Sequence, residues 1–166
     1  MHGEADFVEA LGPRSVLDAG CGTGRVAIEL ARRGLEIVGL DADPGMLSAA
    51  RAKAPGIDWV EADLSDFDLP GAGGRRRFDL ALLAGNVMIF VVPGTEGAVL
   101  EHVAAHLVSG GRLVAGFQLM PGRLALDRYD DLAAAAGLTL EARYATWERD
   151  PWVPGGDYAV SVHRLP

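Results

Sequence analysis

The sequence predicts an α/β fold: a three-layer sandwich with helices on both faces of a mostly parallel, seven-stranded sheet. Short apolar runs, closed by glycine or by an acid, alternate along the chain with amphipathic runs of helical spacing. The last two apolar runs are joined by a connection too short for a crossover helix, so they predict an antiparallel hairpin. The length of 166 residues suits one core. We therefore expect a single domain over residues 1–166.

The first elements are a short helix, a strand, a helix and a second strand. The N-terminal helix is expected over residues 4–11. Ser15–Ala19 is a short apolar run that ends at a glycine, which is typical of a buried strand. Apolar residues then repeat at helical spacing over residues 23–33, and Gly34 supplies the stop. The apolar run at 35–40 is the second strand.

The middle of the chain continues this alternation. Asp43 is a good N-cap with a proline behind it, so the next helix is expected over residues 44–53. A third strand is expected at 57–62 and an acidic, then glycine-rich loop at 63–74. The most apolar run of the chain, at 78–85, predicts the fourth strand.

The last third predicts two helices and three strands. A helix is expected over residues 96–108, ending at Ser-Gly-Gly, and a strand at 112–119. The next helix covers residues 127–136 and ends at a glycine. The hairpin then pairs residues 138–148 with residues 157–164, across a turn that contains Pro-Gly-Gly.

Composition and charge exclude several classes of protein. The net charge of −8 argues against binding to the phosphate backbone of nucleic acids, and the basic run at 75–77 is expected to be a solvated loop. No apolar run is long enough to span a bilayer, and the N-terminus lacks a signal pattern, which indicates a cytoplasmic protein. Cys21 is the only cysteine, so it forms no intramolecular disulfide and no thiolate metal cluster.

The turn after the first strand has an acid on each side. It reads DAGCGTG, and its glycines let the backbone come close to a ligand before a helix begins. Asp41 ends the second strand, where a carboxylate accepts both hydroxyls of a ribose. Asp18 stands two residues before the first glycine and would repel a pyrophosphate. The third glycine is Gly24, whereas the dinucleotide spacing would put it at Arg25. Asp18 would not repel an adenosine ligand that has a cationic end in place of the pyrophosphate, such as S-adenosylmethionine.

At this point the chain resembles the class I S-adenosylmethionine-dependent methyltransferases. The run VLDAGCGTG, from Val16 to Gly24, is similar to the nucleotide-binding motif of that family in every glycine and in the acid. Asp41 matches the family's acid at the end of strand two, and Asp63 in VEADL matches its acid after strand three. The likeness runs from about Arg14 to the C-terminus. It implies a Rossmann-like sheet whose last strand is antiparallel.

The resemblance implies a role for each matching position. Asp18 orients the methionine end of the cofactor, Asp41 takes the ribose hydroxyls, and Asp63 accepts from the adenine amine. Ala42 and Met46 flank the adenine, and the carbonyls of the loop after strand four face the ammonium. The cofactor-binding residues implied in this way are Asp18, Gly20, Gly22, Gly24, Asp41, Ala42, Met46, Asp63, Leu64, Ala84 and Gly85.

The chemistry implied is in-line transfer of a methyl group to a small-molecule acceptor, for which a general base is optional. Asn86 is the first candidate for contact with the reacting groups, because strand four ends closest to the sulfonium. It is followed by VMIF, so the Pro-Pro-aromatic signature of amino-methyltransferases that act on nucleic acids is missing. The further candidates for acceptor contacts are Gln118, Arg123, Trp147, Arg149 and Trp152.

Three histidines are interpreted as structural. His102 and His106 stand one helical turn apart, as two metal ligands would, but no third ligand is evident. We therefore expect an ordinary helix surface there and no metal site. His163 on the last strand is interpreted as a histidine with its hydrogen bonds satisfied rather than as a base.

The N-terminus departs from the family's pattern. Members carry one or more helices before strand one that cover the cofactor, whereas about a dozen residues precede Arg14 here. The site is then unusually open, or a second copy of the chain closes it in a homodimer, or the chain is truncated. Two other functions stay open: a non-catalytic S-adenosylmethionine-binding protein, and a nicotinamide-dependent oxidoreductase, which Asp18 and the glycine spacing disfavour.

Overall fold

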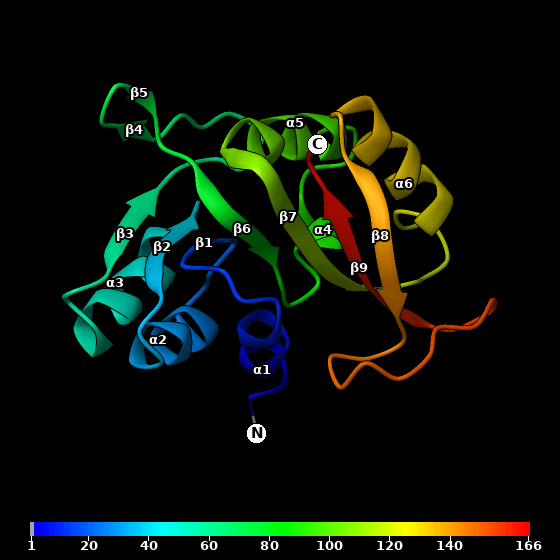
Figure 1. Cartoon of the computed structure of the whole chain (residues 1–166), viewed down its shortest axis with the longest axis horizontal. Helices are drawn as coiled ribbons and strands as arrows, with labels where there is room; N and C mark the ends of the chain where they lie inside the picture. Colours follow the sequence, from blue (N-terminus) through cyan, green and yellow to red (C-terminus); the bar gives the residue numbers. More distant parts are fainter. Residues whose placement is uncertain (1) are drawn as a thin grey trace.

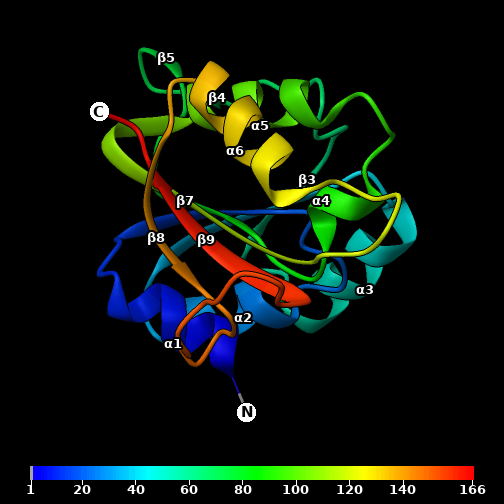
Figure 2. The same cartoon turned by 90° about the vertical axis from the view of Figure 1, so that its right-hand side faces the viewer.

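The computed structural model describes residues 2–166 and contains a seven-stranded sheet between two layers of helices (Figures 1 and 2). The strand order is β3-β2-β1-β6-β7-β9-β8. The strands of this sheet are β1 (Ser15–Ala19), β2 (Glu36–Asp41), β3 (Asp58–Glu61), β6 (Phe78–Leu83), β7 (Leu107–Gln118), β8 (Thr139–Tyr144) and β9 (Tyr158–Arg164). The helices are α1 (Gly3–Ala10), α2 (Arg25–Arg32), α3 (Pro44–Lys53), α4 (Val87–Phe90), α5 (Glu96–Ala105) and α6 (Leu126–Ala135).

Strands β1, β2, β3, β6 and β7 are parallel neighbours, and β9 is antiparallel to both of its neighbours. The chain order predicted for the sheet is therefore confirmed, including the C-terminal hairpin. Its closing strand β9 inserts between β7 and β8, so β8 is the edge strand of the sheet. Parallel strands all end at one edge, which is where such folds hold their ligands.

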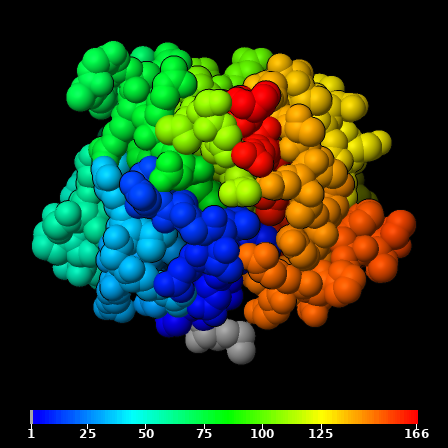
Figure 3. All heavy atoms as spheres, viewed as in Figure 1, coloured from blue at the N-terminus to red at the C-terminus, as the bar shows by residue number. Residues whose placement is uncertain are grey.

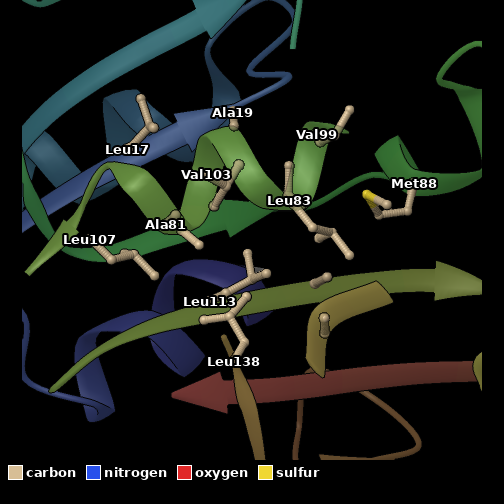
Figure 4. Close-up of a cluster of buried hydrophobic side chains, with 14 of the residues drawn as sticks. Leu17, Ala19, Ala81, Leu83, Met88, Val99, Val103, Leu107, Leu113 and Leu138 are labelled. Atoms are coloured by element: carbon tan, nitrogen blue, oxygen red, sulfur yellow. The ribbon is translucent and has the colours of Figure 1, made fainter. Parts of the chain in front are cut away.

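The two faces of the sheet are covered by different helices, because side chains alternate along each strand. Val16 and Leu82 pack with α1, α2 and α3, whereas Leu17 and Leu83 pack with α5 and α6. Figure 4 shows part of the second cluster, with Val103 facing the apolar side chains of β1, β6 and β7. Both faces of the central strands are buried, which explains why these strands are apolar along their whole length.

Several predicted boundaries from residue 63 onward were wrong, including the start of β7, which was expected at residue 112 and lies at Leu107. Helix α5 ends at Ala105, before the predicted 108, because the Leu107 side chain is fully buried and β7 already pairs there with Phe78. Strand β8 stops at Tyr144, before the predicted 148. The predicted loop at 63–74 contains a two-stranded hairpin, β4 (Pro70–Gly71) and β5 (Gly74–Arg75). Such short elements leave no periodic signal in a sequence.

The basic run begins on this hairpin, and two of its three arginines are ion-paired, whereas Arg77 donates to the Leu107 carbonyl at 3.3 Å. Arg75 binds Asp68, and Arg76 binds both Glu36 and Asp58. The expectation of a surface loop is therefore confirmed. None of the helices within residues 2–166 is long and apolar enough to cross a membrane.

Candidate functional site

Two adjoining clefts lie at the edge where the parallel strands end, and Gly20 and Gly85 line both of them. The first, here called the Asp41 cleft, has a volume of about 330 Å³. It is lined by Gly20, Asp41, Ala42, Asp63, Leu64, Gly85, Val87, Phe90, Val91, Val92, Thr95 and Val99. The second, the Asp18 cleft, has a volume of about 250 Å³. It is lined by Asp18, Gly20, Cys21, Gly22, Thr23, Arg25, Val26, Ala84 and Gly85.

The three glycines of the turn have different physical reasons to be glycine. All three have positive φ, at 80°, 55° and 84° for Gly20, Gly22 and Gly24. A Cβ at Gly20 would lie 2.7 Å from Val87, and one at Gly24 would lie 2.5 Å from the indole of Trp59. A Cβ at Gly22 would meet no atom within 4 Å. Gly20 and Gly24 thus allow close internal packing, and Gly22 is the position of the turn that is open to a ligand.

The turn is held to the neighbouring strand by its own amides. The Gly20 and Cys21 amides both donate to the Leu40 carbonyl, at 2.7 and 3.0 Å, and the Gly22 amide donates to Asp41 Oδ2 at 2.8 Å. The Gly24 amide donates to the Cys21 carbonyl at 3.0 Å. Four of the five amides from residue 20 to 24 are therefore occupied inside the protein, which fixes the shape of the turn.

Asp41 joins the two strands at this edge. Its second carboxylate oxygen, Oδ1, accepts from the Asp43 amide at 2.9 Å. Asp43 in turn caps α3, because its Oδ1 accepts from the amides of Gly45 and Met46. A carboxylate oxygen has more than one lone pair, so Asp41 keeps accepting capacity toward the cleft that it lines.

Asp18 is the most unusual charged group of the site. Its side chain is 3% exposed, and burial raises its pKa from 3.8 to about 7. A hydrogen bond from the Ala27 amide and the charge of Arg25 oppose that rise, and the negative charges of Asp41 and Glu4 add to it. A carboxyl group in this state gains free energy from a cation that enters the Asp18 cleft.

The predicted adenine-side residues divide into two groups. Ala42, Asp63 and Leu64 line the Asp41 cleft as expected. The Asp63 carboxylate accepts from the Ser65 amide and hydroxyl, at 2.8 and 2.7 Å, and the Ser65 hydrogen bonds lower its pKa. Met46 does not line either cleft and has 43% of its surface exposed. Of the predicted cofactor residues that follow the turn, all except Met46 therefore line at least one cleft. Gly85 lines both.

Gly24 also stands apart from the other glycines, since it lines neither cleft. Its role in the structure is to seat α2 close to Trp59, as its contact distance shows. Of the three glycines expected to approach the ligand, Gly20 and Gly22 line a cleft, whereas Gly24 belongs to the packing of the helix on the sheet.

Asn86 follows the two residues, Ala84 and Gly85, that line the clefts after β6. Gly85 and Asn86 both have positive φ, of 68° and 63°, and they turn the chain into the short helix α4. The Asn86 side-chain oxygen accepts from the Gln118 amide at 2.8 Å. This hydrogen bond ties the end of β6 to the end of β7, and Asn86 lines neither cleft.

The other candidates for acceptor contacts also lie outside the two clefts. Arg123 donates to the Ile89 carbonyl at 3.2 Å, and Trp147 donates to the Tyr158 hydroxyl at 3.1 Å. Arg149 donates to the Phe7 carbonyl and stacks on the Phe7 ring. Three of these five side chains thus hold loops in place, and Trp152 lies under the Arg143 guanidinium. Gln118 is exposed at the end of β7.

Sequence reasoning missed the apolar wall of the Asp41 cleft and the start of α2. The wall consists of Val87, Phe90, Val91, Val92, Thr95 and Val99, and Phe90 and Val92 are each 69% exposed. The run VMIFVV after β6 is the signal that indicates this wall, because these apolar residues lie outside the predicted strand. At the start of α2, Thr23 and Arg25 line the Asp18 cleft, and Arg25 follows the last glycine of the motif directly.

Cys21 and the histidines have other roles. Burial and the nearby Asp18 and Asp41 charges raise the pKa of the Cys21 thiol, so it stays protonated and is no nucleophile.

The expectation of an ordinary helix surface was wrong for His106. It is fully buried, its ring stacks on Phe67, and its Nε2 accepts from the Leu69 amide at 3.0 Å. Within residues 2–166 no group of three potential metal ligands comes together.

His163 is also buried, on the face of the sheet that α6 covers. Its Nε2 lies 3.4 Å from Asp130 Oδ1, and its Nδ1 has no hydrogen-bond partner within residues 2–166. The expectation that its hydrogen bonds are satisfied therefore holds for one of its two nitrogens. It lines neither cleft.

The sequence and the structure both resemble known methyltransferases. The family model described as "Methyltransferase domain" matches residues 16–111. An uncharacterised methyltransferase of Mycobacterium tuberculosis is 31% identical over 91% of this chain and 64% of its own length. The trans-aconitate 2-methyltransferase of Methylobacterium nodulans is 30% identical over 92% of this chain and 60% of its own length. The chain thus spans less than two thirds of the curated relatives it matches.

Solved structures give the same picture. The crystal structure of a TehB-like SAM-dependent methyltransferase from Corynebacterium glutamicum is 33% identical, with a TM-score of 0.91 over 100% of this chain and 89% of that one. The CcbJ methyltransferase from Streptomyces caelestis superposes with a TM-score of 0.87 at 23% identity, over 99% of this chain and 94% of that one. The second of these likenesses concerns the fold alone.

Proposed function

Because this chain belongs to the class I S-adenosylmethionine-dependent methyltransferases, we propose that it transfers a methyl group from S-adenosylmethionine to a small-molecule acceptor. The observation that carries the proposal is the buried Asp18 carboxyl at the head of the glycine turn. It lines a cleft and has a pKa raised to about 7. A cationic ligand relieves the cost of burying that charge, whereas a pyrophosphate would increase it.

The residues of the two clefts fit this cofactor. A Cβ at Gly22 would fill open space, so the turn offers room for a ligand beside its backbone. The Asp41 cleft combines the Asp41 carboxylate near the turn with an apolar wall, which suits a ribose and an adenine ring. The Asp18 cleft is smaller and more polar, as the amino acid end of the cofactor requires. Gly20 and Gly85 lie where the two parts would meet.

Each residue has a definite task in the proposed complex. Asp18 receives the positive charges of the methionine end, together with the backbone of Ala84 and Gly85. Asp41 accepts hydrogen bonds from the ribose hydroxyls, worth about 1.5–3 kcal/mol each because the acceptor is charged. Ala42 and Leu64 lie against the adenine, and the Asp63 oxygen that Ser65 leaves free accepts from its amine.

When bound, S-adenosylmethionine supplies an activated methyl group, which an acceptor takes by in-line displacement. The chain's contribution is to hold the acceptor in line and to exclude water. The hydrogen bond from Gln118 to Asn86 fixes the ends of β6 and β7 relative to one another. We propose that Asn86 serves as a positioning residue for the wall beside the reacting groups.

Two observations support a small-molecule acceptor. The relative from Methylobacterium nodulans is, by its name, a methyltransferase of the small molecule trans-aconitate, and the walls of the two clefts of this chain carry one basic side chain. The net charge of −8 opposes contact with a nucleic acid backbone. We therefore propose no nucleic acid partner.

Calorimetry with three ligands tests the proposal: S-adenosylmethionine, S-adenosylhomocysteine and a nicotinamide dinucleotide. We expect the first two to bind and the third to give no heat. Binding of the dinucleotide alone would overturn the assignment and favour an oxidoreductase. Binding of S-adenosylmethionine without methyl transfer to any member of a broad acceptor panel would favour a cofactor-binding protein without activity.

A further inference from the structure

One side chain of the Asp18 cleft has no role in the function proposed above. Arg25 is the first residue of α2 and lines the cleft directly after the glycine turn. It is the one basic residue among the described residues that line either cleft. The charge of Arg25 lowers the pKa of Asp18, and the charge of Asp18 raises the pKa of Arg25.

Arg25 is held in place by the N-terminal helix. Its Nη2 lies 2.6 Å from Glu4 Oε1 and its Nη1 lies 3.3 Å from Glu4 Oε2, which is a two-pronged contact. The Glu4 side chain is 17% exposed and that of Arg25 59%. The guanidinium is therefore fixed on one edge and open to solvent elsewhere.

Helix α1 itself is anchored on both sides. Arg33 of the α2 C-terminus binds Asp6 and Glu9 at 2.8 and 2.7 Å. On the other side, the Phe7 ring packs edge-on against Trp147, and Arg149 stacks on it. In Figure 3 the N-terminal residues lie against the segment before the last strand. The position of Glu4 is thus set by packing that does not involve Arg25.

The amino acid end of the proposed cofactor carries a carboxylate as well as an ammonium. The amides of Gly20, Cys21, Gly22 and Gly24 already donate within the protein, so the turn has little left to offer an anion. Asp18 suits the ammonium and would repel the carboxylate. The donors left to an anion in this cleft are those of Thr23 and of the first turn of α2, and Arg25 is the one side chain there whose charge can neutralise it.

We infer that Arg25 binds the carboxylate of the cofactor's amino acid end and that Glu4 is the positioning residue that holds the guanidinium at the cleft. The inference rests on the proposed function, since it assumes the same ligand. A guanidinium has five N–H donors, so it can stay hydrogen-bonded to Glu4 and donate to a second carboxylate on another edge. Because Glu4 is in place beforehand, binding does not have to order the long arginine side chain.

The test compares two ligands that differ in the carboxylate alone. S-adenosylhomocysteine carries it, and decarboxylated S-adenosylhomocysteine keeps the adenosine and the amine without it. We expect Arg25→Gln to weaken binding of the first ligand by about tenfold to a hundredfold, the range for a lost charge-assisted contact. Binding of the second ligand should change by less than about twofold, because it lacks the group that Arg25 recognises.

Arg32→Gln is the matched control. Arg32 lies on the same helix, its side chain is 74% exposed, and its nearest acid is 3.9 Å away. We expect it to bind both ligands like the wild type. Arg25→Lys should recover part of the lost affinity, and Glu4→Gln should weaken S-adenosylhomocysteine less than Arg25→Gln does, again without effect on the decarboxylated ligand.

Two results would overturn the inference. One is an Arg25→Gln variant that binds S-adenosylhomocysteine as well as the wild type does. The other is an equal loss for both ligands, which would mean that Arg25 shapes the cleft without touching the carboxylate. A wild-type protein that binds neither ligand would instead refute the proposed function, so the two failures are distinguishable.

Discussion

Two buried ionisable groups on opposite faces of the sheet show how differently a protein can treat a charge. Asp18 is 3% exposed at the site, and His163 is 1% exposed under α6. His163 belongs to a cluster that is neutralised internally. Asp130 binds the Arg143 guanidinium and lies 3.4 Å from His163, and Arg143 also donates to the Ser161 hydroxyl. Among residues 2–166, Asp18 forms no comparable ion pair, and the Arg25 charge acts on it from a distance.

The difference separates structure from function. Burial lowers the pKa of His163, which disfavours its charged form beside a compensated pair of charges. Burial raises the pKa of Asp18 to about 7, and the nearby acids Asp41 and Glu4 raise it further. A buried acid without compensation is costly to the folded protein. Such a cost is typical of sites at which a ligand supplies the missing charge.

The largest effect is expected from Asp18→Asn on the free energy of unfolding. The folded protein holds a proton on Asp18 that the unfolded chain loses above about pH 4, so ionised Asp18 costs the fold stability as the pH rises toward 7. The shift from 3.8 to about 7 corresponds to about 4 kcal/mol, present in full above pH 7. We expect the variant to be more stable than the wild type by up to that amount at pH 8.

The control for this prediction is the same pair of proteins at pH 4, where Asp18 is protonated in the folded state and the variant should gain little. Urea denaturation at both pH values gives the difference. An equal gain at pH 4 and pH 8 would mean that Asp18 is not ionised at a cost. The variant should also lose affinity for S-adenosylmethionine by about a hundredfold or more, since a charged acceptor is removed.

At the compensated cluster the same kind of change should have the opposite sign. Asp130→Ala leaves Arg143, whose side chain is 13% exposed, without its carboxylate. Breaking a buried pair costs about 3–5 kcal/mol, and we expect about 3 because Asp130 is itself 31% exposed. Thermal or urea unfolding measures the loss. Affinity for S-adenosylhomocysteine should stay within twofold, and a large drop in affinity would couple this cluster to the site.

Asp41→Ala should have a smaller effect that falls on binding. Asp41 lines the first cleft and also accepts from the Gly22 amide, so the change removes a ribose acceptor and one anchor of the turn. We expect S-adenosylhomocysteine to bind more weakly by about 2–3 kcal/mol in calorimetry. Asp43→Ala is the neighbouring control, because it removes a helix cap and should cost stability without a comparable loss of affinity. Unchanged affinity in Asp41→Ala would show that the ribose assignment is wrong.

The sequence predicted the order of strands and helices along the chain and both acids of the turn because these follow from local patterns. Asp18 and Asp41 each close an apolar strand, and parallel strands bring their ends to one edge. The places of Ala42, Asp63 and Leu64 beside the adenine were implied by the family resemblance, and all three line one cleft. The distinction among the glycines was beyond local patterns, because it depends on Val87 and Trp59, which arrive from other parts of the chain.

What the sequence could not predict are contacts between distant segments. His106 looked like a surface residue because its helix spacing says nothing of the loop that carries Leu69 and Phe67 across it. Asn86 was the candidate for contact with the reacting groups, and nothing in the sequence indicated that its side-chain oxygen accepts from the amide of Gln118, 32 residues away. The pairing of Glu4 with Arg25 likewise depends on how α1 lies against α2. Long-range geometry decides which polar residue faces a ligand.

The smallest effect, and the most direct comparison of the two buried groups, is the pH dependence of S-adenosylmethionine binding by the wild type. A cationic ligand binds best to ionised Asp18, so affinity should rise by about tenfold from pH 6 to pH 8 if a pKa of about 7 controls it. Histidines commonly titrate in this range, but burial holds the pKa of His163 below its usual value, which moves its titration away from the rise expected here. His163→Gln should therefore keep the rise in affinity, and Asp18→Asn should bind weakly at every pH with a flat profile. A rise that disappears in His163→Gln and survives in Asp18→Asn would reverse the roles of the two groups.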